Sequence, residues 1–258
     1  MSQTPKIEMC DVHKAFGPKH VLNGIDLHVD AGESLVIIGG SGSGKSVMLK
    51  CMLGLILPDR GTVIVDGEDV TNFKGKERER VLKKFGMLFQ NSALFDSLKV
   101  WENVAFGLIE GEGMDRENAR GIAFEKLARV GLTEDVGNLD PAELSGGMKK
   151  RVGLARAIAT EPEIIFFDEP TTGLDPIMGD VINHLIIECV KDLGSTAITI
   201  THDMASARTI ADRVAMIFKG EIIWNGPVES VTSSGNEYVD QFISGRAEGP
   251  IEMDVLKP

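Results

Sequence analysis

The sequence has no apolar run long enough to cross a bilayer. No stretch without a charged residue is longer than residues 34–44, which are few and rich in glycine. A membrane-spanning helix needs about 20 mostly apolar residues. The amino terminus, MSQTPKIEMC, also lacks the apolar core of a secretory signal peptide. We therefore expect a chain that neither spans a membrane nor is exported by a signal peptide.

The sequence also lacks the excess of positive charge that nucleic-acid binding favours. Its net charge is −12, whereas a phosphate backbone binds clusters of Lys and Arg, so we expect no nucleic-acid partner. Free nucleotides are not excluded, because local geometry rather than net charge holds them. The three cysteines (Cys10, Cys51 and Cys189) lack metal-ligand spacing, and so few of them are typical of a reducing cytosol.

The apolar pattern predicts a chain of alternating strands and helices. Short alternations in residues 7–16 and 21–29 favour an antiparallel edge ribbon. The continuous apolar run of residues 34–38 is typical of a strand buried on both faces. We expect further strands at residues 63–66, 85–89, 164–167, 196–201, 214–218 and 221–224, and helices at residues 47–57, 117–130, 147–158 and 178–193.

This alternation predicts an α/β fold with a parallel-sheet core, an antiparallel β ribbon and an inserted helical subdomain at about residues 91–160. We assign residues 6–245 to one domain and residues 246–258 to a C-terminal tail. In the tail, Ile251, Met253 and Val255 alternate with acidic residues. That period favours an extended strand, and we expect it to dock on a partner rather than to fray.

A glycine-rich loop follows the buried strand and precedes a predicted helix. It fits the pattern G-x-x-x-x-G-K-[ST] and consists of Gly39, Gly40, Ser41, Gly42, Ser43, Gly44, Lys45 and Ser46. Its backbone N–H groups and the helix start can face an anion. We expect Lys45 to reach the β- and γ-phosphates of ATP and Ser46 to ligate Mg²⁺. The strand before it and the helix after it disfavour a plain turn.

Two carboxylates follow the apolar strand at residues 164–167. Asp168 and Glu169 emerge at its carboxyl end, where ligands bind in parallel sheets. We expect Asp168 to hold Mg²⁺ through water and Glu169 to polarise the attacking water, a role worth about 10²–10⁴-fold in rate. The alternative, two solvated acids at a strand end, is disfavoured by the glycine-rich loop.

A second glycine-containing segment, Leu144-Ser145-Gly146-Gly147, directly precedes a helix. A serine and two glycines there present a hydroxyl and bare N–H groups to an anion. With this segment, the chain resembles the ATP-binding cassette (ABC) family over nearly its full length. The resemblance implies the ABC type of P-loop NTPase fold. It also implies a homodimer in which ATP lies between the phosphate loop of one subunit (residues 39–46) and the signature of the other (residues 144–147).

Other residues stand where that family places functional groups. The resemblance implies catalytic roles for Gln90, His202 and Lys45, a further Mg²⁺ ligand in Gln90, and adenine stacking on Phe16. The segment Gly173-Leu174-Asp175 after Glu169 matches as well. The chain departs from the commonest pattern at Met148, where Gln is usual, and at Phe16, where Tyr is usual. Neither departure touches the phosphate chemistry.

Longer strings narrow the resemblance to the ATPases of Mla/Mce-type lipid transporters. They are GGSGSGKSVMLK (39–50), FQNSALFDSL (89–98), LSGGMKKRV (144–152) and TTGLDPIM (171–178). This resemblance implies a place on the cytoplasmic face of the inner membrane and transport of phospholipid between inner and outer membranes. The implied partners are an integral membrane permease, an MCE-domain protein and, in some systems, a STAS-domain subunit.

Alternatives remain open. The chain could serve another ABC transporter, such as an amino-acid importer. A soluble ABC protein of translation or DNA repair is disfavoured, because such proteins usually carry two cassettes or a long coiled-coil insertion. A scaffold without turnover is disfavoured by the presence of both Glu169 and His202. After Gln90 the chain is apolar at Ala93, Leu94, Phe95 and Leu98, and we expect these residues to line a groove for a permease helix.

Overall fold

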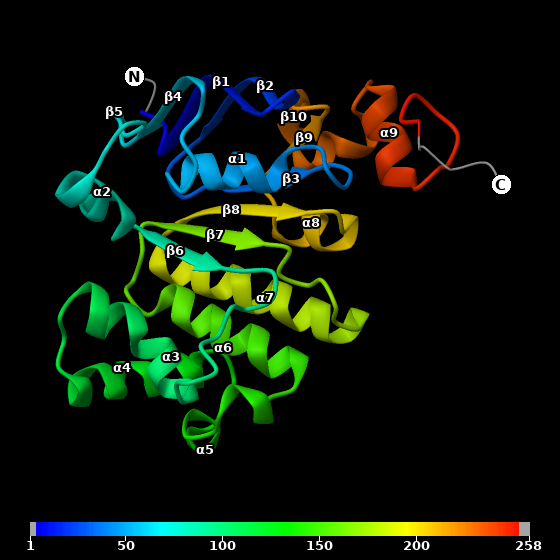
Figure 1. Cartoon of the computed structure of the whole chain (residues 1–258). Coiled ribbons are helices and arrows are strands. Elements are labelled where there is room, and N and C mark those ends of the chain that lie inside the picture. The colour runs from blue at the N-terminus through cyan, green and yellow to red at the C-terminus, as the bar shows by residue number, and fades with distance from the viewer. Residues whose placement is uncertain (1–3, 253–258) are drawn as a thin grey trace.

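A six-stranded sheet forms the centre of the molecule, in a computed structural model that describes residues 4–252 (Figure 1). The order is β10-β9-β3-β8-β7-β6, with β9 to β6 all parallel and β10 antiparallel to β9. The strands are β3 (Ser34–Ile38), β6 (Phe85–Leu88), β7 (Ile164–Asp168), β8 (Thr196–Thr201), β9 (Arg213–Phe218) and β10 (Glu221–Pro227). The predicted parallel α/β core is confirmed.

A four-stranded antiparallel sheet lies beside the central sheet. It has the order β2-β1-β4-β5 and contains β1 (Ile7–Phe16), β2 (Lys19–Val29), β4 (Arg60–Val65) and β5 (Glu68–Asp69). Strands β1 and β2 pair antiparallel along their whole length, which confirms the predicted ribbon. The turn between β9 and β10 has positive φ at Lys219 (48°) and Gly220 (83°), the conformation that two-residue hairpins favour.

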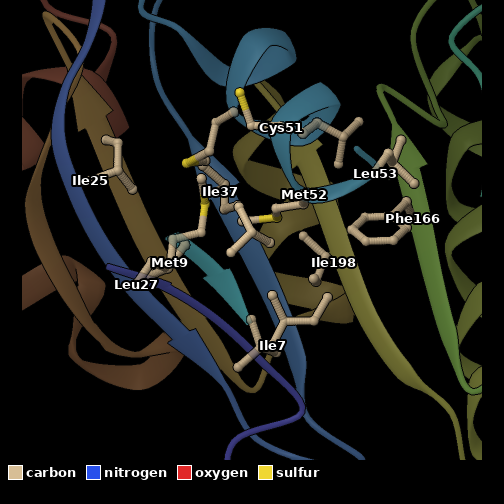
Figure 2. Packing of buried hydrophobic residues seen from close by; sticks show 14 of the residues in the cluster. Ile7, Met9, Ile25, Leu27, Ile37, Cys51, Met52, Leu53, Phe166 and Ile198 are labelled. Carbon is tan, nitrogen blue, oxygen red and sulfur yellow. The ribbon is translucent and has the colours of Figure 1, made fainter. Parts of the chain in front are cut away.

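The buried strands send alternate residues to opposite faces of the central sheet. Ile37, Phe166 and Ile198 join the cluster between this sheet, helix α1 (Lys45–Met52) and the antiparallel sheet (Figure 2). Their neighbours Ile165 and Phe167 join the cluster on the other face, which includes the helical lobe. Each such side chain stabilises the fold by about 1.5–3 kcal/mol when fully buried. Residues buried on both faces explain the unbroken apolar runs in the sequence.

All regular elements between residues 91 and 160 are helical. They are α3 (Val100–Phe106), the π-helical turn η1 (Gly107–Gly111), α4 (Arg116–Arg129), α5 (Glu134–Gly137), the 3₁₀ turn η2 (Pro141–Glu143) and α6 (Gly146–Ile158). Asp115 caps α4, because its carboxylate accepts hydrogen bonds from the N–H groups of residues 117 and 118. These elements form the lower lobe in Figure 1, and the predicted helical insertion is confirmed.

Helix α1 is shorter than the sequence pattern predicted. It begins at Lys45, directly after the glycine-rich loop, and ends at Met52 instead of continuing to residue 57. Gly54 has φ 63°, a left-handed conformation that stops a helix, and Pro58 follows it closely. Helix α7 (Pro176–Leu193) starts two residues before the predicted residue 178, because Asp175 caps it. Short helices occur at α2 (Gly75–Leu82), α8 (Met204–Ile210), η3 (Val228–Ser233) and α9 (Glu237–Ser244).

The described part of the C-terminal tail folds back on α9 of its own chain. Ile251 N–H donates to Gln241 Oε1 at 2.7 Å, and Gln241 Nε2 donates to the carbonyl oxygens of Ile251 at 3.1 Å and Arg246 at 3.2 Å. Residues 246–252 do not form a strand there. Met253 and Val255 lie outside the described residues, so the predicted strand and its docking stay predictions. Within residues 4–252, no helix is both long and apolar enough to cross a membrane.

Candidate functional site

The phosphate loop joins the buried strand β3 to helix α1. A side chain at Gly39 would place its Cβ 2.4 Å from the carbonyl oxygen of Ile217, and one at Gly44 would lie 2.9 Å from that of Val21. Gly44 is also the N-cap of α1, with φ 113°. Only glycine fits both positions, because the loop passes so close to the neighbouring backbone. Among the described residues, no side chain caps the N–H groups at the start of α1, so these groups are open to a ligand.

Lys45 is nearly buried at the base of this loop, with 8% of its surface exposed. Its Nζ donates to the carbonyl oxygens of Gly39 at 2.7 Å and Gly40 at 3.0 Å. Burial lowers the pKa of Lys45, while the carboxylates of Glu169 and Asp168 act in the opposite direction. The hydroxyl of Ser43 is buried and has no hydrogen-bond partner among the described residues. A buried cation and a spare hydroxyl in a glycine cradle fit the phosphates of a nucleotide.

Asp168 ends β7 with its carboxylate half-buried. Burial raises its pKa, and the charge of Glu169 raises it further, against the opposing effect of three nearby lysines. The site thus carries negative charge that a divalent cation would offset. In residues 4–252 no three His, Cys, Asp or Glu side chains gather as a metal site. A Mg²⁺ ion held by Asp168, Ser46 and Gln90 would therefore complete its oxygen shell with phosphate and water.

Glu169 is held in an unusual backbone conformation directly after β7. Its φ is 48°, which costs a non-glycine residue about 1–3 kcal/mol and occurs mostly at functional sites. The Oε2 atom lies 2.9 Å from His202 Nδ1 and accepts hydrogen bonds from Thr172 Oγ1 at 3.1 Å and Thr201 Oγ1 at 3.4 Å. Only 9% of Glu169 is exposed, so its carboxylate is fixed in direction and can act on one adjacent water.

His202 stands at the end of β8, so the fold brings this predicted residue against Glu169. Its side chain is 60% exposed, with Nδ1 directed to the Glu169 carboxylate. This 2.9 Å contact places the Nδ1 edge of the ring against the Glu169 carboxylate. Its Nε2 edge is thereby oriented away from Glu169, where it can reach a second group.

The signature forms the start of α6. Ser145 is the N-cap, and its Oγ accepts a hydrogen bond from the N–H of Met148 at 3.3 Å. Ser145 and Gly146 are exposed, whereas a Cβ at Gly147 would lie 3.0 Å from Met178 Cγ. Helices α1 and α6 pack on opposite faces of the central sheet (Figure 1). One chain therefore holds the phosphate loop and the signature apart.

Gln90 and Phe16 lie at the edges of the site. Gln90 is exposed just beyond β6, and its carbonyl accepts a hydrogen bond from Lys150. Phe16 ends β1 with 48% of its surface exposed, and Lys14 Nζ lies 5.6 Å from its ring centre. An open aromatic face of this kind can stack on a flat base.

Three polar residues around the Gln90 loop, two of them buried and one half-buried, were missed by the sequence reasoning. Lys150 and Arg156 donate to loop carbonyls from α6, and Asn103 holds residues 95–99 from α3. A signal for Lys150 was present. It is spaced by three and four residues from Gly147 and Leu154, which places all three on the buried face of one helix.

Comparisons with known proteins agree with this arrangement. A family model described as ABC transporter matches residues 22–172. The chain is 41% identical over 251 residues to the probable ribonucleotide transport ATP-binding protein mkl of Mycobacterium tuberculosis strain H37Rv, covering 97% of this chain and 70% of the relative. It is 37% identical over 245 residues to the intermembrane phospholipid transport system ATP-binding protein MlaF of Escherichia coli strain K12, covering 95% and 91%.

Further similarities extend to another transport system and to solved structures. The chain is 40% identical over 241 residues to the glutamine transport ATP-binding protein GlnQ of Escherichia coli strain K12, covering 92% of this chain and 98% of the relative. The dimeric, post-hydrolysis structure of the ATP-binding cassette MJ0796 bound to ADP and Pi superposes with a TM-score of 0.79. Its sequence is 33% identical, and the match covers 86% of this chain and 98% of that one.

Proposed function

We propose that this chain, which belongs to the ABC transporter family, is the ATP-hydrolysing subunit of an Mla-type phospholipid transporter. Family membership and ATP hydrolysis rest on the family match and on the similar cassette bound to ADP and Pi. The observation that carries hydrolysis in this chain is the buried Glu169 carboxylate, oriented 2.9 Å from His202. The phospholipid is supported by the similarity to MlaF over most of both chains.

In the proposed site, the phosphate loop and Lys45 bind the β- and γ-phosphates of ATP. Ser46, Asp168 and Gln90 would hold Mg²⁺, which would offset phosphate charge. Glu169 accepts a proton from the attacking water, and hydrogen bonds from two hydroxyl groups hold its carboxylate in position. His202 Nδ1 orients that carboxylate, while its other ring nitrogen is directed toward the γ-phosphate. Phe16 stacks on the adenine.

We propose that two copies of the chain share each ATP. The exposed face of Ser145 and Gly146 is a helix start with free N–H groups, yet it lies away from the phosphate loop of its own chain. A partner in the reverse orientation would bring it to the γ-phosphate. The dimeric state of the similar cassette supports this arrangement.

A cavity of about 640 Å³ is a candidate seat for a permease helix. It lies between β6 and the helical lobe, and residues along its wall include Met87, Phe106 and Arg156. The four predicted residues are not in its wall. Phe95 instead adjoins the cavity, with its ring centre 4.6 Å from that of Phe106, and both rings are more than one third exposed. We further propose that the chain acts at the cytoplasmic face of the inner membrane, a location that the similarity to MlaF supports.

Lipid extraction from the purified transporter complex tests the transported substrate. The chain and its co-purifying membrane partners are isolated as the Glu169→Gln variant, which should retain ATP, and bound lipids are identified by mass spectrometry. Phospholipid above the level in a detergent-matched control supports the proposal. Co-purification with a permease that binds glutamine or another amino acid and carries no excess lipid would favour the amino-acid importer that the similarity to GlnQ leaves open.

A further inference from the structure

Lys150 connects two parts of the site that are far apart in the sequence. It projects from α6 and is nearly buried, with 5% of its surface exposed. Its Nζ donates to the carbonyl oxygen of Glu169 at 3.1 Å and to that of Gln90. A lysine ammonium carries three N–H donors in a compact group, so one side chain can hold both carbonyls at once.

The contact with Glu169 fixes a strained peptide from both sides. The N–H of Glu169 donates to the carbonyl of Ile200 on β8 at 2.9 Å, and its carbonyl accepts from Lys150. With φ at 48°, Glu169 would gain by relaxing to an ordinary conformation. Relaxation would turn the carboxylate away from His202. The Lys150 hydrogen bond opposes that rotation.

The contact with Gln90 belongs to a wider set of contacts between α6 and the loop after β6. Arg156 Nη1 donates to the carbonyl of Ala93 at 2.7 Å, and Arg156 Nη2 donates to that of Ser92. Ser92 and Ala93 both have positive φ, 59° and 46°, so the loop also needs external hydrogen bonds to keep its shape. Two cations on α6 thus hold three carbonyls of this loop, but only Lys150 also reaches Glu169.

We propose that Lys150 is a positioning residue for ATP hydrolysis, holding the backbones of Glu169 and Gln90 in one fixed relation to the signature helix α6. The inference rests on the proposed roles of Glu169 and Gln90. Lys150 touches neither phosphate nor water. It acts by keeping the Glu169 carboxylate directed at the attacking water. Through its two hydrogen bonds, a movement of the Gln90 loop or of α6 would also displace the backbone of Glu169.

Three full-length variants separate this role from a purely structural one. Lys150→Met keeps the length of the side chain but removes its donors, Lys150→Arg keeps charge and donors, and Lys149→Met is the matched control. Lys149 is the preceding residue on α6 and is half-buried. The kcat and KM for Mg-ATP, the Kd for nucleotide and the melting temperature are measured for each.

Lys150→Met should lower kcat about 10- to 100-fold, because a displacement of about 1 Å at a catalytic group has that effect. KM and nucleotide Kd should stay within about twofold, since the phosphate loop is untouched. Lys150→Arg should recover most of the loss, and Lys149→Met should resemble the parent. Equal loss in both Met variants, or a rise in KM matching the fall in kcat, would overturn the proposal.

A second background tests whether Lys150 acts through Glu169. In Glu169→Gln, whose own turnover is nearly abolished, Lys150→Met should change the residual single-turnover rate by less than about twofold. Loss by the same factor as in the parent would overturn the proposal while leaving Glu169 as the base. Retained activity in Glu169→Gln alone would instead overturn the proposed function. If Lys150→Met does not fold, Lys150→Leu, which also removes the donors, takes its place under the same criteria.

Discussion

The chain contains two glycine-rich helix starts that differ in how complete they are. The phosphate loop is packed so closely that Gly39 and Gly44 admit no side chain, and its Lys45 is 8% exposed. The signature is packed at Gly147 but open at its start, since Ser145 and Gly146 are exposed and the nearest atom to a Cβ at Gly146 would be 4.0 Å away. Ser145 there caps its helix with ordinary geometry. The phosphate loop is therefore a complete anion-binding loop within one chain, which we call the finished cradle. The signature is an open surface.

The difference indicates a division of labour. Binding a nucleotide needs only the finished cradle, which each copy has. Turnover in the proposed dimer also needs the open surface of another copy. Substitutions in the cradle and its carboxylates should therefore act within one chain, whereas substitutions in the signature should act on the partner.

Glu169→Gln should have the largest effect on the chain's own half of the site. The amide keeps the size and the Thr172 contact but cannot accept a proton from water, so kcat should fall by about 10²–10⁴-fold. The phosphate contacts survive, so ATP binding should stay within about twofold. Steady-state hydrolysis and equilibrium binding of a fluorescent nucleotide measure the two effects.

Size-exclusion chromatography adds a second readout for this variant. With ATP and Mg²⁺, the Glu169→Gln protein should elute as a dimer, because ATP held between two copies is not hydrolysed. The parent protein under the same conditions is the control. Hydrolysis within a few-fold of the parent would show that another group is the base.

Ser145→Arg should abolish turnover while leaving nucleotide binding by the single chain nearly normal. Arginine at this exposed position would block a partner's γ-phosphate but touches nothing in its own phosphate loop. Added to Glu169→Gln, it should also prevent the ATP-dependent dimer. If the signature were only a helix cap, the effect would be a stability loss of about 0.5–2 kcal/mol with normal turnover.

Mixing two inactive proteins sharpens the same comparison. A Lys45→Ala chain lacks the cradle cation, and a Ser145→Arg chain lacks a usable signature. A heterodimer of the two keeps one composite site with a normal cradle and a normal signature. Some turnover should therefore return on mixing. If the phosphate loop and the signature of the same chain acted together instead, every chain would keep its own defect and the mixture would stay as inactive as its components.

The fold was largely predictable because its signals are local. The apolar run of β3 and the glycines of the phosphate loop each specify their own conformation. Helix α1 was overextended because residues 53–57 remain apolar after the helix ends. Leu53 and Ile56 pack on the core outside the helix, whereas Leu55 and Leu57 are exposed. Apolar spacing alone does not distinguish a buried turn from a helix.

The candidate site was predictable in its residues but not in its supports. Glu169 and His202 follow strands that end at one edge of a sheet, so their meeting follows from topology. The links from Lys150 and Arg156 to the Gln90 loop join residues about 60 positions apart. No pattern in the sequence predicts that the buried Lys150 will donate to a backbone carbonyl on the Gln90 loop.

Phe106→Ala tests the cavity between β6 and the helical lobe. Loss of the exposed ring should lower permease-stimulated hydrolysis several-fold and leave basal hydrolysis unchanged, because the ring is far from the phosphate contacts. Phe95→Ala should act in the same direction through the ring contact. Reconstituted complex and isolated chain are compared. Equal loss of both rates, with a lower melting temperature, would show that the rings serve only the packing of the lobe.

The smallest expected effect is the change in stability of the unliganded protein in Asp168→Asn, which tests whether the charge of Asp168 is left uncompensated when no ligand is bound. Burial and Glu169 raise the pKa of Asp168 above its usual 3.8 in the folded chain. The folded protein therefore binds the proton more tightly than the unfolded one, so stability falls as pH rises through the folded pKa. The asparagine is neutral throughout and avoids this loss.

At pH 7 and without nucleotide or Mg²⁺, Asp168→Asn should raise the melting temperature by about 1 °C, a modest gain because the carboxylate is only half-buried and solvent screens it. The gain should shrink as the pH is lowered toward 4. With Mg-ATP the order should reverse, because bound ligand stabilises the parent more. Asp96→Asn, at an exposed position, should change neither value. An unliganded Asp168→Asn protein less stable than the parent at pH 7 would mean that the lysines around Asp168 already offset its charge.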